Sequence, residues 1–434
     1  MMPALVTALM TALLAWWAPA QTDTFTRAFS FDRRGEVLVR IRAGCAKCDW
    51  GEAGREAVAL RLSVDGTYSQ HLFLSRGEGA VDYRVRLGTL APGPHELRIV
   101  RDQQLSAKGA GPATIDIGAI GLVADGSDGF AAQSMAPIVY ARPNTVGTFT
   151  DLPLLMWYEV ETTPRGRQFR YSVIFSNEDG GTETDRLMAT WGRTTDIEFV
   201  YGVEVDAAGQ ILAEEFQGPG HEVPAFKGQH EGRHPLLWVS TDNNMVGESG
   251  PTHMRYAPEA VRFDLTNVSR EAVMDANPWT YAIASVEMRR EGKVVDDAPP
   301  GHNTISDPRR FVYVEACGQV GNAALALSIR AGDRWIPSDR GLPQYRIVRD
   351  GCFRVATPIP GGARVSDIRA LRVQAFERPP AEGAAPAAPD PVHLTRINRV
   401  FMLDEHYLPG ASILKWEGVH TIRAGGDPFE VRIP

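Results

Sequence analysis

The chain has 434 residues, of which 44% are hydrophobic and 23% charged, and its formal net charge is −8 at pH 7. This composition is typical of folded globular protein and excludes general disorder, and the length predicts two or three hydrophobic cores. Because the chain is acidic and has no long basic run, it should repel a polyanion, so we expect no nucleic-acid partner.

The first twenty residues predict a secretory signal peptide. An uncharged apolar run extends from Ala4 to Trp17, and the small-x-small pattern of a signal-peptidase site follows at Ala18-Pro19-Ala20. The run is too short for a comfortable membrane span, and no later stretch reaches the roughly 18 apolar residues that a spanning helix needs. We therefore expect residues 1–20 to be removed and the mature chain to be secreted or periplasmic, without a transmembrane segment.

Residues 21–128 predict an antiparallel β-sandwich. Short alternating segments such as EVLVRIRA (Glu36 to Ala43) and DYRVRLGTL follow one another and are separated by Gly and Pro. In the second segment we expect Val85 on the buried face and Arg86 on the opposite face of a half-buried strand. The phrase LGTLAPGPHELRI resembles accessory β-sandwich modules of secreted carbohydrate-active proteins, and a plain structural sandwich is the alternative.

Four cysteines predict two disulfides. Cys45 and Cys48 form the sequence CAKC, and Cys317 and Cys352 lie in the C-terminal part, so local pairing is the simplest of the three connectivities. A redox-active CxxC would be expected beside a βαβ pattern, which is absent here, so we favour a tight loop-closing disulfide. Disulfides fit an oxidising compartment.

A loop rich in Gly, Asp and Ser at residues 125–130 predicts the boundary to a central β domain at residues 129–310. Within it, the continuous apolar block PLLMWYEVE indicates a strand that is buried on both faces. Short helices are expected only near residues 182–190 and 269–276. Strand patterns return from Phe311 and predict a C-terminal β-sandwich at residues 311–434, which contains a low-complexity loop from Pro379 to Pro391. The predicted fold is therefore all-β, with three consecutive β-sandwich-like domains and few short helices.

The stretch from Trp191 to Asn244 carries the densest polar chemistry of the chain. If TDIEFVYGVEVD is a strand, Asp196 and Glu198 lie side by side on one face, roughly 7 Å apart by the strand repeat. The opposite face is then a core stripe made of Ile197, Phe199, Tyr201, Val203 and Val205. Two such carboxylates can share a hard cation, or one can take a raised pKa and act as an acid. The alternative is that the acidic face simply meets water.

Histidines and amides follow closely. His221 lies in a Gly-rich turn, His234 precedes a strand, and Asp242-Asn243-Asn244 ends that strand. Histidine and carboxylate ligands suit Zn²⁺ or Mn²⁺, whereas Asp and Asn without His suit Ca²⁺. No HExxH or EF-hand spacing occurs. We predict catalytic roles for Asp196, Glu198, His221 and His234, and divalent-metal ligands at Asp196, Glu198, His221, His234, Asp242 and Asn244.

The order of these motifs resembles the vacuolar protein sorting-associated protein 62-like domain family. The resemblance rests on APIVYARPN, then TDIEFVYGVEVD, then the turn with His221, then HPLLWVSTDNN, and it covers about Ala136 to Gly250. It implies that Asp196 and Glu198 match the acids of that family and that His234 matches a His-Pro pair. The family likeness implies a β fold and a site location, and it implies no particular reaction.

Two functions follow as hypotheses. The first is a secreted multidomain β protein whose central domain is a metal-assisted enzyme acting on an extracellular polysaccharide. The alternative is a non-catalytic extracellular protein that binds carbohydrate or forms a surface scaffold. The first requires the acids and histidines to converge in an enclosed place, and the second is favoured if Asp196 and Glu198 point to open solvent.

Overall fold

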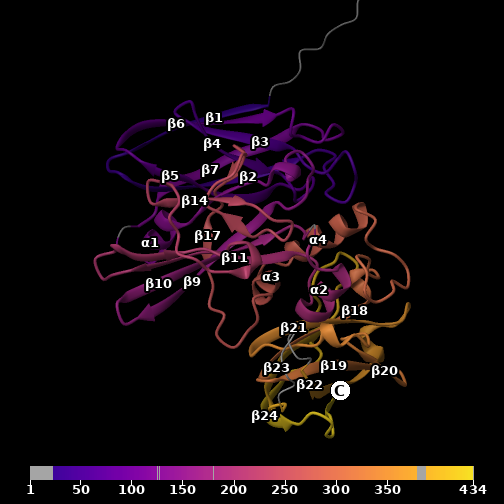
Figure 1. The fold of residues 1–434 in the computed structure, drawn as a ribbon. Coiled ribbons are helices and arrows are strands. Elements are labelled where there is room, and N and C mark those ends of the chain that lie inside the picture. The colour runs from indigo at the N-terminus through magenta and orange to yellow at the C-terminus, as the bar shows by residue number, and fades with distance from the viewer. Residues whose placement is uncertain (1–22, 125, 127, 179, 379–387, 434) are drawn as a thin grey trace, which may run out of the picture.

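The computed structural model describes residues 23–124, 126, 128–178, 180–378 and 388–433. The predicted signal peptide and most of the loop predicted from Pro379 to Pro391 lie outside this part of the chain. Among the described residues, strands in mainly antiparallel sheets dominate and four short α-helices occur, which confirms the all-β prediction. Figure 1 shows the N-terminal strands at one end of the molecule and the C-terminal strands at the other.

The N-terminal segment forms two sheets around one core. Their strand orders are β1-β6-β3-β4 and β5-β2-β7. The strands are β1 (Thr24–Phe31), β2 (Gly35–Cys45), β3 (Ala59–Val64), β4 (Thr67–Phe73), β5 (Val81–Leu90), β6 (Gly93–Asp102) and β7 (Ala113–Leu122). Alternate residues of β2 and β3, such as Val39, Ile41, Leu60 and Leu62, meet in this core because successive strand residues point to opposite faces.

Strand β5 is covered on both faces at its centre, which differs from the half-buried strand that its pattern predicts. Val85 enters the core as expected, but Arg86 is only 1% exposed. Its guanidinium donates hydrogen bonds to the carbonyl oxygens of Ala136 (2.7 Å) and Pro137 (2.5 Å) in the middle segment. The alternating pattern could not reveal that a neighbouring domain packs on the outer face of this strand.

The middle segment contains a five-stranded sheet, β12-β11-β10-β9-β17, and a second sheet, β13-β14-β8-β16, with β15 paired to β14. The strands are β8 (Ile138–Tyr140), β9 (Pro153–Thr163), β10 (Gly166–Phe175), β11 (Asp196–Val205), β12 (Ile211–Glu215), β13 (His230–Glu231), β14 (His234–Val239), β15 (Val246–Gly247), β16 (Arg255–Tyr256) and β17 (Ala260–Arg262). Strand β9 is buried on both faces at its centre, as predicted, because Tyr158 and Trp157 enter different cores.

A β-bulge in β11 changes the side-chain pattern predicted for this strand. Tyr201 pairs with Tyr171 and Phe199 pairs with Ser172, so Val200 is the extra residue. The predicted single stripe is therefore wrong, because the extra residue shifts the alternation by one position. Ile197 packs in a core on the other side of the sheet. The β11 residues in the core between the two middle sheets are Val200, Tyr201, Val203 and Val205.

In the described part of the chain, four α-helices connect the strands: α1 (Asp128–Met135), α2 (Thr184–Trp191), α3 (Ala272–Ala276) and α4 (Trp279–Arg290). Helices α2 and α3 lie where short helices were predicted. Helix α1 begins inside the predicted boundary loop, and α4 was not predicted because its aromatic and β-branched residues are weak helix formers. Packing stabilises α4 instead, since Tyr281 and Ile283 enter two different cores. No helix among the described residues is long and apolar enough to cross a membrane.

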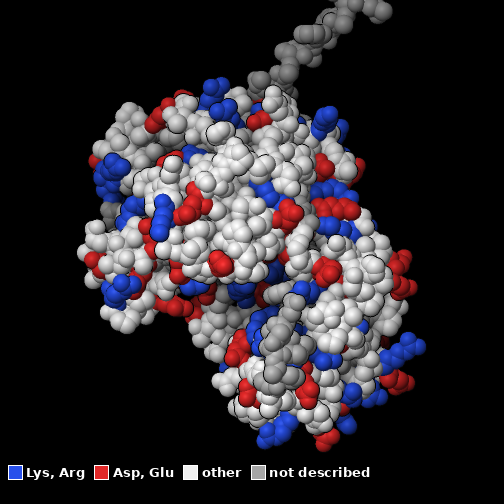
Figure 2. Space-filling view, in the orientation of Figure 1, with Lys and Arg blue, Asp and Glu red and all other residues white. Residues whose placement is uncertain are grey.

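The C-terminal segment forms two four-stranded sheets, β21-β18-β23-β24 and β20-β19-β22-β25, around one core. The strands are β18 (Phe311–Gln319), β19 (Ala323–Ala331), β20 (Arg334–Pro337), β21 (Gly351–Pro358), β22 (Ile368–Glu377), β23 (Val392–Phe401), β24 (Trp416–Ile422) and β25 (Phe429–Arg432). Figure 2 shows this segment as a lobe offset from the rest, with acidic and basic side chains interspersed over the visible face.

Both predicted disulfides are confirmed. Cys45, at the end of β2, is bonded to Cys48 and closes a tight turn. Cys317 and Cys352 occupy directly opposite positions on β18 and β21 and are bonded to each other. Each bridge therefore lies within one domain, and neither ties two domains together.

Candidate functional site

Four polar side chains are buried together at one end of the five-stranded sheet. Asp196 and Glu198 lie at the start of β11, Glu178 lies just beyond the end of β10, and Asn244 lies between β14 and β15. We call these four residues the carboxyl cluster. Asp196, Glu198, Glu178 and Asn244 are 1%, 7%, 6% and 0% exposed, respectively, so the interpretation that the acidic face meets water is wrong.

Asn244 holds the cluster against the surrounding loops. Its backbone has a φ of 55°, in the left-handed region that Asn tolerates better than most residues. Its side-chain nitrogen lies 3.2 Å from the carboxylate of Asp196, 3.2 Å from that of Asp151 and 3.2 Å from the carbonyl oxygen of Asn177. Its Oδ1 has no hydrogen-bond partner among the described residues. The amide therefore positions Asp196 and leaves one buried acceptor available.

The carboxyl groups of the cluster bind protons more tightly than ordinary side chains do. Burial, aided by repulsion from Asp196, raises the pKa of Glu178 to about 8. Burial and the neighbouring Glu198 raise the pKa of Asp196 well above its usual range, and burial also raises the pKa of Glu198. Arg193 is 3.7 Å from Asp196 but 3.2 Å from Glu271, so its charge is shared with a residue outside the cluster. At neutral pH the cluster therefore retains a proton.

A turn that carries Gln217 and His221 covers the outer side of the cluster. The Gln217 amide donates a hydrogen bond to the Glu198 carboxylate, and its nitrogen lies 3.5 Å from Nδ1 of His221. His221 is exposed. Of the four cluster residues, Glu198 has the largest exposed fraction. The structure thus brings Glu198 and His221 to the same edge, with Gln217 between them.

Asp242 is tied to the cluster only indirectly. Its carboxylate forms an ion pair with Arg142, which also lies 2.5 Å from Asp151. Asp151 in turn accepts the hydrogen bond from Asn244 described above. The Asp242 side chain is 65% exposed, so it lies at the surface end of this chain of contacts.

His234 lies apart from the carboxyl cluster. Its Nδ1 is 2.9 Å from a guanidinium nitrogen of Arg86 and 3.0 Å from the carbonyl oxygen of Ala136, and its Nε2 is 3.3 Å from Glu36. Within the described chain, no hydrogen bond or ion pair joins His234 to Asp196 or Glu198. The structure therefore places this histidine at the junction with the N-terminal sandwich. The His234-Pro235 motif in the sequence does not indicate this location.

The six predicted metal ligands do not converge as one set. Among the described residues, no group of three or more His, Cys, Asp or Glu side chains is arranged to hold a metal ion. Asp196, Glu198 and Asn244 do lie together, and their oxygen atoms are hard donors of the kind that Ca²⁺, Mg²⁺ and Mn²⁺ prefer. Zinc, which prefers nitrogen and sulfur, fits this part of the site less well.

Sequence reasoning missed Glu178, Gln217 and Arg193. Glu178 could have been found from the pairing of β10 with β11, in which Phe175 lies opposite Asp196. Because antiparallel neighbours bring the end of one strand to the start of the next, an acid just after Phe175 lies near the acids of β11. No comparable signal marks Gln217, whose position depends on how a long turn folds.

The fold and the site define a multidomain all-β protein with a buried, proton-binding carboxyl cluster in its middle domain. No protein-family model matches the chain, and no curated protein matches it.

Three solved structures show weak likeness to the chain. NLPPya in complex with mannosamine is 12% identical with a TM-score of 0.24, and the match covers 32% of this chain and 75% of that chain. The GH2 beta-galacturonidase from Eisenbergiella tayi bound to galacturonate is 10% identical with a TM-score of 0.16, covering 47% and 28%. The tandem CBM51 modules of Sp3GH98, the family 98 glycoside hydrolase from Streptococcus pneumoniae SP3-BS71, are 9% identical with a TM-score of 0.15, covering 88% and 81%. Similarity this low carries no argument about function, which has to rest on the site.

Proposed function

We propose that the protein is an exported enzyme that cleaves an extracellular polysaccharide by acid–base chemistry at the carboxyl cluster. One observation carries the proposal: the carboxyl groups of Glu178, Asp196 and Glu198 are buried together at one end of the five-stranded sheet, where burial raises the pKa of each. Glycoside hydrolysis needs one carboxyl group that keeps its proton at neutral pH and a second that is ionised. Three neighbouring carboxyl groups with different exposure and different hydrogen-bond partners can meet this need.

The environments of the three acids suggest their roles. Glu178, whose pKa is raised by burial and by Asp196, would hold the proton that is given to the leaving oxygen, and the fully buried Asp196 would act through Glu178 without touching the substrate. Glu198 lies at the outer edge, accepts a hydrogen bond from Gln217, and is opposed in its pKa rise by Arg270 and Arg193, so it would ionise first and act as the base. His221 would exchange protons with solvent at the same edge. Asn244 would position Asp196.

A divalent cation is a second proposal for the same place. It is favoured by a buried oxygen atom, Oδ1 of Asn244, that has no hydrogen-bond partner within the described chain. Asn244, Asp196 and Glu198 would supply three oxygen ligands for Ca²⁺, Mg²⁺ or Mn²⁺, with water or substrate completing the coordination, and the cation would polarise a substrate oxygen. Elemental analysis of the purified protein and of an Asp196→Ala, Glu198→Ala variant tests this idea. Equal metal content in both, or none in either, refutes it.

Two further expectations remain proposals. Export is supported by the two disulfides, which are typical of oxidising compartments. Membership of the vacuolar protein sorting-associated protein 62-like domain family is proposed for the middle domain alone, on the motifs that carry the resemblance.

Release of new reducing ends from a panel of neutral and acidic polysaccharides tests the enzymatic proposal. We expect Glu198→Gln and Glu178→Gln to lose activity by about two orders of magnitude or more, as removal of a general acid or base does. Glu222→Gln is the matched control because Glu222 is exposed next to His221. If the wild-type protein binds a polysaccharide and cleaves none of the panel, the non-catalytic carbohydrate-binding alternative replaces the enzyme.

A further inference from the structure

A cavity lies between the N-terminal sandwich and the middle domain. It has a volume of about 330 Å³ and is lined by β4, β5 and the loop between them, the start of β9, β16, β17 and the start of α4. This size falls within the range of small-molecule sites. We call it the interdomain groove, and its principal side chains are Arg76, Tyr83, Tyr256 and Trp279. No carboxyl-cluster residue lines it, so binding here is independent of the function proposed above.

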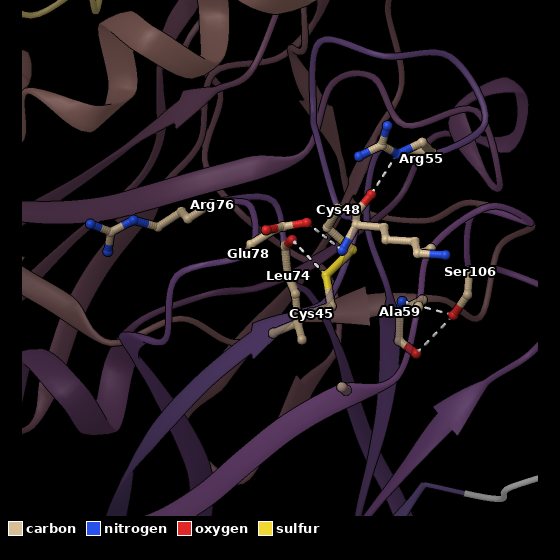
Figure 3. The surroundings of a disulfide bond; sticks show 12 residues. Cys45, Cys48, Arg55, Ala59, Leu74, Arg76, Glu78 and Ser106 are labelled. Atoms are coloured by element: carbon tan, nitrogen blue, oxygen red, sulfur yellow. Dashed lines mark hydrogen bonds between the residues drawn. A yellow bond between two sulfur atoms is a disulfide. The ribbon is translucent and has the colours of Figure 1, made fainter.

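Arg76 presents its charge to this groove. Its guanidinium stacks over the ring of Trp279, with 4.5 Å between the guanidinium carbon and the ring centroid. Figure 3 shows the Arg76 side chain extending away from the Cys45–Cys48 disulfide and from the Glu78 carboxylate. Among the described residues, no carboxylate forms an ion pair with Arg76 and no acceptor receives a hydrogen bond from its guanidinium.

The two acids of the groove already have other arginine partners. Asp82 lies 3.5 Å from Arg42, and Glu259 lies 3.4 Å from Arg84. Burial also lowers the pKa of Arg76, which reflects the cost of keeping this cation partly out of water. An anion in the groove would offset that cost.

Tyr83 places Arg76 and offers a further donor. The backbone N–H of Arg76 donates a hydrogen bond to the Tyr83 hydroxyl oxygen at 3.3 Å. Since the hydroxyl oxygen is used as an acceptor, its own hydrogen remains available, and no described residue accepts it. An anion that reaches the guanidinium would therefore meet a second donor.

We propose that the interdomain groove binds the carboxylate of a uronic acid unit of an acidic glycan. Stacking on Trp279 fixes the guanidinium plane and leaves its N–H edge for a bidentate pair with a carboxylate. The partly buried ring of Trp279 suits the apolar face of a sugar ring, and the cavity volume suits one or two such rings. We expect a phosphate site to contain more than one cation without an acidic partner. Among the described lining residues, Arg76 is the arginine without such a partner, so a carboxylate fits the groove better than phosphate.

The indole resonances of isotope-labelled tryptophan in the purified protein test the proposal. D-Glucuronate and D-galacturonate are the probes, with D-glucose and D-galactose as neutral counterparts. The Trp279 resonance, assigned from a Trp279→Phe variant, should shift with the acids and stay unchanged with the neutral sugars. Arg76→Gln should weaken uronate binding roughly tenfold or more, because a bidentate charge-assisted pair is lost.

Arg372→Gln is the matched control because Arg372 stacks over Trp335 at 4.0 Å in the C-terminal domain. It should bind uronate as the wild-type protein does. Equal shifts with neutral sugars, or unchanged uronate affinity in Arg76→Gln, would overturn carboxylate recognition. Equal competition by acetate or by an acidic tripeptide would overturn the sugar assignment. If Arg76→Gln does not fold, Arg76→Lys, which keeps the charge and loses the planar fork, should still bind uronate more weakly than the wild-type protein.

Discussion

Replacing Glu178 by Gln should make the stability of the protein less dependent on pH. Glu178 has an ordinary pKa of 4.5 when unfolded, and burial with repulsion from Asp196 raises it to about 8 in the folded protein. A carboxyl group with a raised folded pKa contributes stability that is fully present below pH 4.5 and is lost as the pH rises to about 8. Glutamine has nearly the same shape as the protonated acid and cannot ionise.

The size of the effect follows from the shift. One pKa unit corresponds to about 1.4 kcal/mol, so the whole shift corresponds to at most about 5 kcal/mol of unfolding free energy. Glu178→Gln should therefore gain stability relative to the wild-type protein by about 1 kcal/mol per pH unit between roughly pH 5 and pH 8.

Urea unfolding of both proteins across this pH range measures the difference, with Glu222→Gln as an exposed control that should leave the pH profile unchanged. If the unfolding free energies of Glu178→Gln and the wild-type protein stay parallel from pH 5 to pH 8 in that experiment, Glu178 ionises normally. Glu178 could then not be the proton donor that we propose.

Three further changes test other features. Removing the Cys317–Cys352 bridge with alanines should lower the unfolding free energy by about 4 kcal/mol, because a closed loop of 35 residues is opened; an unchanged urea midpoint would contradict this. Arg86→Met should cost about 3 kcal/mol or more, since the carbonyl oxygens of Ala136 and Pro137 lose a charged donor, whereas Arg84→Met, at an exposed pair, should cost little. Asn244→Ala should be less stable than Asn244→Gly by about 1 kcal/mol, because only glycine adopts positive φ freely; the reverse order in thermal melts would refute the strain argument.

Much of the architecture could be predicted because it depends on local pattern. Period-two alternation identifies β2 and β5, the apolar block identifies β9, and cysteine spacing identifies both disulfides. Asp196 and Glu198 could be placed near each other because two strand residues on one face are neighbours whatever the rest of the chain does. The strand pattern alone could not predict whether these two acids are buried or exposed to solvent.

The remaining features depend on contacts between distant segments. The extra residue Val200 in β11 can be recognised only from its partner strand, and Arg86 is buried only because another domain covers it. His234 was grouped with the acids because it is near them in sequence, yet its side-chain partners, Glu36 and Arg86, come from β2 and β5. The raised pKa of Glu178 depends on Asp196 and Arg193. Helix α2 separates both of these residues from Glu178 in the sequence, so the sequence alone does not show that they are neighbours.

The Cys45–Cys48 bridge bears on how this protein should be prepared. The turn it closes donates a hydrogen bond from the Lys47 backbone to Glu78 at 2.7 Å, and Glu78 lies two residues from Arg76. A chain made in a reducing cytosol would lack the Cys45–Cys48 disulfide even if its N-terminal sandwich folded around the apolar core. The turn that contacts Glu78, near Arg76, would then be less constrained. Material for ligand screening should therefore come from an oxidising expression host, and thiol reductants should be kept out of the buffers.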